Sequence, residues 1–285
     1  MKIRITFLLS LIFAFSASFG QTYTEEDAAI CKSKFQLAVD KNITDAPIGD
    51  VIAFIGRSFL GVNYVAHTLE KGDEENLVIN LTGLDCTTFL ENCLTFGRLV
   101  KANKNEFADY MKELTYIRYR DGVLDKYPSR LHYFSDWIRN NTSKGIVTDI
   151  TESIGGKEIK FNIFFMSQNP DKYHQLNENP DFVPEIKAVE EEINKKTYYY
   201  IPKEEVKNIE TKIQNGDLIA ITTSFKGLDI GHVGVAVKEK TGRIHFMHAP
   251  LVGSKVQISE DPLPDYLAKI KKHTGIIVLR PTEIK

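Results

Sequence analysis

Apolar residues recur every three or four positions through the first half of the chain, which is the spacing of a helix with one buried face. This spacing predicts helices over residues 24–40, 48–59 and 87–101. Residues 104–143 follow it less regularly, so we expect irregular helical structure there. Residues 183–196 carry a run of charges, which indicates a surface helix with a solvated face.

The last third of the chain has a different pattern, in which short apolar segments are separated by Gly, Lys, Asp and Pro. The segments "GDLIAITTS", "HVGVAVKE", "RIHFMHAP" and "TGIIVLRP" predict an antiparallel sheet. Residues 157–164 alternate like a further strand, and "GVNYVAHTL" and "NLVINL" bracket a polar turn that is typical of a hairpin. Because helices come first and strands later, the expected fold class is α+β.

The N-terminus has the pattern of a secretory signal peptide. Lys2 and Arg4 precede an apolar run from Ile5 to Phe15, and small residues follow. We therefore expect residues 1–20 to be removed and the protein to be exported. The run is too short for a comfortable membrane span and no other stretch is long enough, so stable membrane insertion is not expected.

Composition narrows the class of protein further. The chain has 285 residues, of which 42% are hydrophobic and 26% are charged, which is ordinary for a globular protein with a sizeable core. A formal net charge of −2 provides no basic footprint. Nucleic acid is therefore not expected as a partner.

The chain has three cysteines, an odd number that leaves a free thiol or an intermolecular bridge in an exported protein. Cys31 lies in an amphipathic helix pattern, and Cys93 follows Cys86 by two helical turns, so both are interpreted as core residues. Cys86 differs, because it stands at the predicted start of a helix.

The start of this helix offers a chemical role for the thiol. Asp85 precedes Cys86 as a plausible N-cap, and Thr87 and Thr88 fill the first turn. Unpaired backbone N–H groups at a helix start favour an anion, so they are expected to lower the thiol pKa. The same groups suit an oxyanion during acyl transfer. The alternative is a buried structural cysteine, and position alone does not decide between the two.

A nucleophilic thiol needs a base, and two histidines are placed to supply one. The turn "KEKTG" joins the strands that carry them, and counting back from it makes His248 or Ala249 the partner of His232. His232 and His248 are thus expected to be direct cross-strand neighbours with side chains about 5 Å apart. Strand alternation sends His245 to the other face. Gly231 and Gly234 flank His232 and leave room for a close approach.

Two other interpretations of this histidine pair stay open, a satisfied polar core and a metal site with Cys86 as third ligand. A metal site is disfavoured, because Cys86, His232 and His248 already form a nucleophile, a base and an orienting group. His67, His174 and His273 lie in polar surroundings and are expected at the surface.

The order of these motifs resembles that of a known superfamily. "LDCTTFLE", then "NGDLIA", "IGHVGVAV" and "FMHA", resembles the NlpC-type cell-wall cysteine peptidases and amidases, which are papain-like enzymes of bacterial envelopes. "NYVAHTLE" and "SRLHYFSDWI" are more similar to the N-acetylmuramoyl-L-alanine amidase-like family within it. The resemblance implies one papain-like domain over residues 21–285. Its nucleophile opens a helix packed on a C-terminal antiparallel sheet, and a family-specific, largely helical insertion spans about residues 103–200.

The resemblance also implies a role for each matching residue. Cys86 would be the nucleophile, His232 the general base and His248 the orienting third member. Tyr64 and Asp85 would contact substrate beside the nucleophile. The superfamily usually has Ser-Gly after the cysteine, whereas this chain has two threonines, and this departure favours the amidase branch.

"SRLHYFSDWI" allows two interpretations. Arg130 would pair a substrate carboxylate while His132, Tyr133 and Trp137 wall a sugar. Alternatively, the aromatic residues pack onto the domain and the arginine is solvated.

The function that the resemblance implies is a periplasmic cysteine amidase of peptidoglycan fragments, which cuts between N-acetylmuramic acid and L-alanine through an acyl-enzyme. No cofactor is required, and muropeptides are the expected partners. The long segment between Cys86 and His232 is expected to narrow the cleft, which favours small soluble fragments. The alternatives are an endopeptidase cutting between D-glutamate and a diamino acid, a non-catalytic wall-binding module, and a general protein-cleaving enzyme.

Overall fold

A computed structural model of the chain describes residues 20–70 and 72–284. Apart from Gly20, the predicted signal peptide lies outside the described residues. No helix in the described ranges is both long and apolar enough to cross a membrane.

An antiparallel sheet organises the C-terminal half, and over the described residues it has eight strands. Its strand order is β11-β10-β9-β8-β12-β7-β6, and β5 also pairs with β12. This confirms the α+β class and the antiparallel sheet. The strands of this sheet are β5 (Val147–Asp149), β6 (Lys157–Ile159), β7 (Tyr198–Pro202), β8 (Leu218–Thr223), β9 (Ile230–Lys238), β10 (Ile244–His248), β11 (Gln257–Pro262) and β12 (His273–Pro281).

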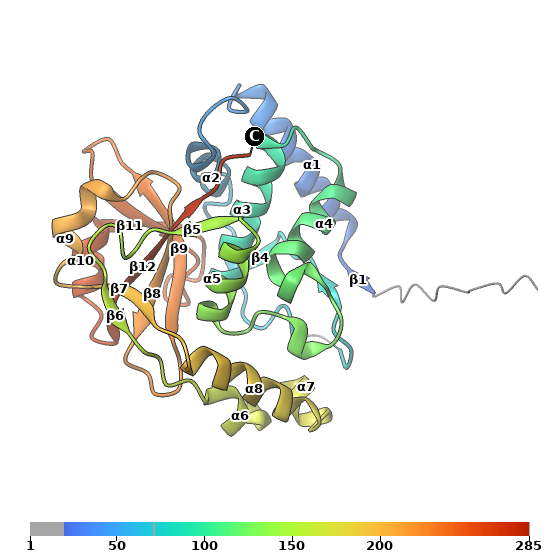
Figure 1. Cartoon of the computed structure of the whole chain (residues 1–285). Coiled ribbons are helices and arrows are strands. Elements are labelled where there is room, and N and C mark those ends of the chain that lie inside the picture. Colours follow the sequence, from blue (N-terminus) through green and yellow to red (C-terminus); the bar gives the residue numbers. More distant parts are fainter. Residues whose placement is uncertain (1–19, 71, 285) are drawn as a thin grey trace, which may run out of the picture.

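Helices cover both faces of the sheet (Figure 1). Those described are α1 (Glu25–Asp40), α2 (Ile48–Arg57), α3 (Cys86–Lys101), α4 (Phe107–Arg118), α5 (Phe134–Ser143), α6 (Phe165–Gln168), α7 (His174–Glu178), α8 (Phe182–Asn194), α9 (Val206–Ile209) and α10 (Leu263–Ala268). Figure 1 shows α2, α3 and α5 on one side of the sheet and α9 and α10 on the other. The helices expected over residues 24–40, 48–59 and 87–101 are therefore present, with ends shifted by no more than two residues.

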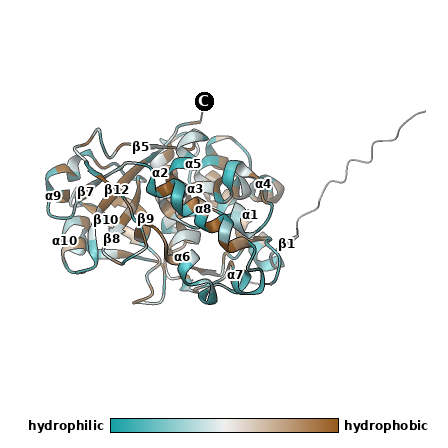
Figure 2. Cartoon of the chain, turned by 60° about the horizontal axis from the view of Figure 1, so that its bottom comes forward, coloured by the Kyte–Doolittle hydropathy of each residue, from teal (hydrophilic) through white to brown (hydrophobic). Residues whose placement is uncertain are grey.

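The alternation of β9 explains why the sheet has a core on each face. Val233, Val235 and Val237 belong to the larger apolar core, which includes α1 to α5. Ala236 belongs to the smaller core beneath α9 and α10. Figure 2 shows hydrophobic residues along the strands in the interior and hydrophilic residues on the outer helices. Both faces of β9 are buried along most of its length, so its position is fixed from both sides.

The predicted hairpin before α3 is wrong. β2 (Asn63–Tyr64) pairs in parallel with β4 (Gly83–Leu84), and β3 (Leu77–Val78) pairs in parallel with β1 (Gln21–Thr22). Residues 72–74 between them are exposed, but Glu70 and Glu75 on either side form ion pairs with buried Arg130.

The segment over residues 103–200 shares its core with the rest of the chain. β5 and β7 both pair with β12, and Trp137 of α5 is fully buried in the larger core. The charge run of α8 has one buried side as well as its solvated face, since Glu190 is 2% exposed and accepts hydrogen bonds from Tyr133 and Ser167.

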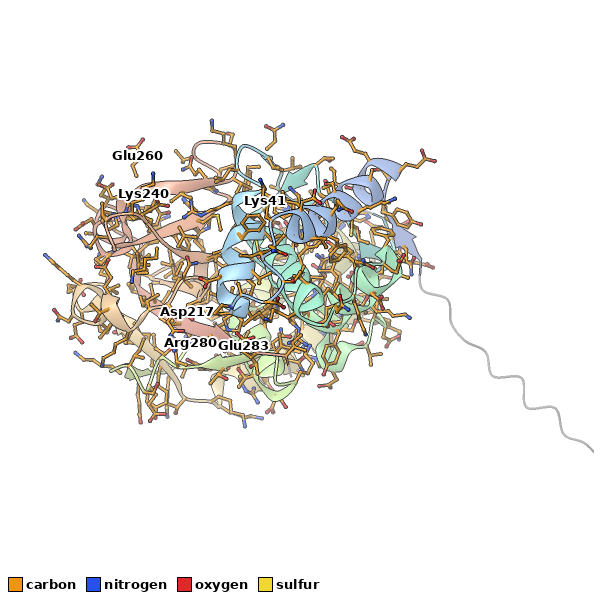
Figure 3. The ribbon with its side chains drawn as sticks, turned by 90° about the horizontal axis from the view of Figure 1, so that it is seen from above. Lys41, Asp217, Lys240, Glu260, Arg280 and Glu283 are labelled. Carbon is orange, nitrogen blue, oxygen red and sulfur yellow. The ribbon has the colours of Figure 1, made fainter. Side chains whose placement is uncertain are left out.

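An ion pair fixes the last strand to the centre of the sheet. Asp217, just before β8, binds the guanidinium of Arg280 on β12 at 2.8 and 2.9 Å, and Figure 3 shows the two side chains together. Beyond it, the carboxylate of Glu283 accepts the backbone N–H of Ile48, the first residue of α2. The C-terminal segment thereby joins the sheet to the helical layer.

Candidate active site

A cavity of about 360 Å³ opens where the start of α3 meets the start of β9. Six of the seven residues predicted for the site line it, namely Tyr64, Asp85, Cys86, Arg130, His132 and His232. The seventh, His248, lies behind His232 and is 1% exposed.

The start of α3 is fixed by a reciprocal cap. The carboxylate of Asp85 accepts the backbone N–H of Thr88 at 2.8 Å, and the Thr88 hydroxyl accepts the backbone N–H of Asp85 at 2.9 Å. Such a capping box satisfies donors at the helix end and fixes where the first turn begins. Cys86 is therefore the first residue of α3, as the sequence predicted.

The end of β10 leaves room for the thiol beside β9. The backbone N–H of Ala236 donates to the carbonyl oxygen of Asp217, on the β8 side of β9. Because N–H groups alternate between the two sides of a strand, the odd-numbered residues of β9 direct theirs towards β10. The pairing with β10 ends at Val235, which leaves the N–H of Val233 without a strand partner. The backbone of Val233 instead faces the sulfur of Cys86 and acts to lower the pKa of its thiol. The thiol thus lies directly against the residue that follows His232.

The two histidines form a hydrogen bond, but the predicted register is wrong. His232 Nε2 and His248 Nδ1 are 2.7 Å apart. Lys238 pairs with Ile244, so position 250 would be opposite His232, and His248 is a diagonal neighbour. The turn between β9 and β10 is one or two residues longer than predicted. Because His232 and His248 still lie on the same face of the sheet, their side chains remain in contact.

Gly234 serves this packing and not the approach of a ligand. A Cβ at Gly234 would lie 2.5 Å from the backbone oxygen of Met247 and 2.8 Å from the ring of Phe246. The absence of a side chain therefore lets β10 and the ring of Phe246 come close to β9. Gly231 is exposed and lines the cavity, in agreement with the expected room beside His232.

The expected low thiol pKa is not what the structure gives. Burial, and secondly the carboxylate of Asp85, raise the pKa of Cys86 to about 12, although hydrogen bonds from Val233 and Thr87 oppose the rise. Burial also lowers the pKa of His232 to about 4 and that of His248 to about 3. At neutral pH the resting pair is therefore a thiol and a neutral imidazole, because the cavity wall disfavours both charges.

Comparison with known proteins now places the chain. The family model of N-acetylmuramoyl-L-alanine amidase-like proteins matches residues 54–276. The chain belongs to the N-acetylmuramoyl-L-alanine amidase-like family. All seven predicted site residues fall within the matched range.

Several solved structures are similar to this chain. An N-acetylmuramoyl-L-alanine amidase from Bacteroides uniformis is 37% identical, with a TM-score of 0.77 over 82% of this chain and 99% of that chain. A Bacteroides fragilis protein proposed to be a xylanase is also 37% identical, with a TM-score of 0.74 over 79% of this chain and 98% of that chain. A Legionella pneumophila protein, 20% identical over 90% and 95% of the two chains, shares the fold with a TM-score of 0.69. Among curated protein sequences, none matches.

At the candidate site, Arg130 is not the solvated residue that one interpretation expected. It is 5% exposed and its guanidinium lies 2.6 Å from Glu70 and 3.3 Å from Glu75. Its charge is therefore matched by two carboxylates of the chain itself, although part of the residue lines the cavity.

Trp137 differs from the predicted sugar wall, whereas His132 lines the cavity. The ring of His132 packs on Tyr127, and its Nε2–H donates to the Tyr127 carbonyl at 2.8 Å, which leaves Nδ1 as an acceptor. Burial, and secondly Arg130, hold the pKa of His132 well below its usual value. Trp137 is fully buried and donates to Glu91 at 3.2 Å, so it does not wall the cavity.

Sequence reasoning missed three polar residues near the site. Glu91 and Arg118 form an ion pair at 2.7 Å, both nearly fully buried, and both line the cavity. Glu91 lies five residues after Cys86, and that spacing in an apolar helix was an available signal. His273 was expected at the surface but is only 8% exposed. A register shift between residues 273 and 275 changes which face of the sheet this residue is on, so counting along the strand does not predict its burial. In the described part of the chain, no group of three metal-binding side chains is present.

The low pKa values of the two buried histidines predict how the stability of the fold depends on pH. His232 and His248 take up protons near pH 4 and 3 when folded but near 6.5 when unfolded, so the folded state binds fewer protons between these values. Stability is therefore complete above about pH 6.5 and is lost as the pH falls, by about 2 kcal/mol at pH 5 for one histidine shifted from 6.5 to 4. Urea unfolding at pH 7 and pH 5 measures this loss. The His248→Asn variant should show a smaller pH dependence, and an equal dependence would contradict the assignment.

Proposed function

We propose that the chain is a cysteine amidase that hydrolyses the amide between N-acetylmuramic acid and L-alanine in peptidoglycan fragments. The observation that supports this best is the position of the Cys86 thiol. It lies at the capped start of α3 and against the backbone of Val233, next to a His232–His248 hydrogen bond of 2.7 Å. Family membership supplies the amide bond as the target.

The proposed reaction begins from the neutral pair. Because Nε2 of His232 is engaged with His248, Nδ1 is the nitrogen left for the thiol proton. As the sulfur attacks the amide carbonyl, this proton passes to Nδ1, and the backbone N–H groups at the start of α3 stabilise the oxyanion. The imidazolium then gives the proton to the leaving L-alanine nitrogen, and a thioester to the muramoyl lactyl group remains. Water attacks this thioester with His232 as base, which releases the acid and restores the thiol.

We also propose that the arrangement is papain-like, as the resemblance implied, with the nucleophile helix packed on the sheet. The cavity volume of about 360 Å³ matches a small muropeptide better than an intact wall. The leader pattern supports export to the periplasm, where such fragments are produced.

An endopeptidase acting between D-glutamate and a diamino acid is the second candidate. Tyr64 and Asp85 both interact electrostatically with Cys86, and they offer a hydroxyl and a carboxylate that suit a free L-alanine amine. A glycosidase is disfavoured, because it needs a pair of available carboxylates. The cavity-lining carboxylates of the described residues are engaged, Glu70 and Glu91 with arginines, Asp229 with the backbone of Ser135, and Asp85 as the helix cap.

The test is digestion, in separate reactions in ¹⁸O-labelled water, of one defined disaccharide tripeptide and of the corresponding free tripeptide, with products read by mass spectrometry. The amidase yields a free peptide beginning with L-alanine and places ¹⁸O in the lactyl carboxylate of the sugar. The endopeptidase cuts the free tripeptide, which has the free L-alanine amine, and yields L-Ala-D-Glu with ¹⁸O in the glutamate. Absence of any cleavage would contradict both and favour a binding module, and cleavage of a xylan oligosaccharide under the same conditions would favour the glycosidase.

A further inference from the structure

A group of rings lies behind His232 that the proposed reaction does not use. His248 is 1% exposed, and its Nε2 atom has no hydrogen-bond partner among the described residues. Tyr266, from α10, lies against it with ring centroids 5.3 Å apart and planes crossing at 75°. A buried polar atom without a partner is costly, so the surroundings of Nε2 decide whether it carries a proton or a lone pair.

The proton between the two histidines gives this choice a functional consequence. Both rings are neutral at pH 7, so one proton lies between His232 Nε2 and His248 Nδ1. If His232 donates it, its Nδ1 keeps a lone pair for the thiol, and His248 carries its own proton on Nε2. If His248 donates it, His232 carries its proton on Nδ1 and has no lone pair for the thiol. The tautomer of His248 therefore decides whether His232 can act as a base.

The rings around His248 favour the first arrangement. Phe246 lies 4.7 Å away at 34°, so it covers a face of the imidazole, and His232 occupies Nδ1. Tyr266 crosses the imidazole in the arrangement in which the edge of one ring meets the face of another. An aromatic face is electron-rich, so it attracts an N–H edge and repels a lone pair.

We propose that Tyr266 is a positioning residue whose ring face holds His248 in the Nε2–H tautomer, so that His232 keeps its Nδ1 lone pair for Cys86. The inference rests on the proposed role of His232 as the base. Tyr266 is itself held by neighbouring rings, 5.5 Å from Phe246 and 6.0 Å from His273. Its orientation towards His248 is thereby fixed from more than one side.

The test is ¹⁵N NMR of the full chain labelled at histidine, at pH 7, for wild type, Tyr266→Phe and Tyr266→Leu. Wild type and Tyr266→Phe should both show His232 and His248 protonated at Nε2, because phenylalanine keeps the ring face. Tyr266→Leu should populate the Nδ1–H tautomers of both rings. It should also lower kcat by about 5- to 30-fold with KM nearly unchanged, the effect of losing one or two kcal/mol of tautomer preference.

Leu263→Val is the matched control, because it changes buried packing on the same helix without removing the ring. Equal tautomer shifts in Leu263→Val, or wild-type tautomers in Tyr266→Leu, would overturn the proposal. A shift in Tyr266→Phe would also overturn it, since the hydroxyl would then be the acceptor. Tyr266→Met, which fills similar space, replaces the leucine variant if that does not fold. The spectra need no substrate, so a tautomer shift without any amide cleavage would refute the proposed function alone.

Discussion

Replacing Cys86 with alanine is expected to abolish hydrolysis of the muropeptide amide while leaving the fold intact. Without the sulfur there is no thioester, so the rate should fall by on the order of 10⁶-fold, below detection. Because Cys86 is partly exposed and alanine keeps the Cβ and suits the first helical turn, the midpoint of thermal unfolding should change little. Mass spectrometry of the released peptide and a thermal melt measure the two quantities.

Cys93→Ala is the matched control for this result. Cys93 lies on the same helix but is fully buried in the larger core. Its truncation should lower the free energy of unfolding by about 1–2 kcal/mol through lost packing, while activity per folded molecule stays the same. Product formation by Cys86→Ala at the rate of wild type would end the role given to this thiol.

Replacing His232 with asparagine is expected to lower kcat by about 10²- to 10⁴-fold, the usual contribution of a general base, with a smaller change in KM. Burial lowers the pKa of His232 to about 4, so the base is protonated and inactive only below that pH. The wild-type kcat/KM should therefore stay level from neutral pH down to about 5 and fall near pH 4. The variant should lose this acid limb, because asparagine does not titrate.

His245→Asn provides the comparison within the same hairpin. Its Nδ1–H donates to the backbone oxygen of Ser259 at 2.8 Å, and alternation places it on the opposite face of β10 from His248. Both the rate and the acid limb should be retained. If His245→Asn and His232→Asn reduce the rate equally, the loss reflects damage to the hairpin and the role of His232 as the base fails.

The sequence was most informative where a local pattern has only one packing solution. The helix from Cys86 was predictable because Asp85 is a cap residue and the apolar stripe that follows has helical spacing. The choice of His232 and His248 among seven histidines was also predictable, because strand alternation survives a slip of register by two. The sequence pattern did not predict the residue at which the pairing between β9 and β10 ends, because that residue depends on the length of the turn between them.

Two of the errors share a physical cause, because each involves a charged or polar group that the fold buries. Glu70 and Glu75 belong to a segment expected to be a surface turn, yet they neutralise Arg130. The thiol pKa was expected to fall because of the helix start, but desolvation and Asp85 outweigh that effect. Burial of polar groups follows from long-range packing, and a single sequence does not reveal which distant segments will cover them.

The early end of β10 has a mechanical consequence. One strand, β9, supplies both the imidazole of His232 and the amide that contacts the sulfur, and neighbours on either side hold it in the middle of the sheet. The two groups cannot be adjusted separately, because any insertion or deletion in this strand displaces both together. The spacing between α3 and β9 is then the single dimension that sets the geometry of the reacting atoms. Changes in the layers outside this pair should be tolerated as long as they preserve that one spacing.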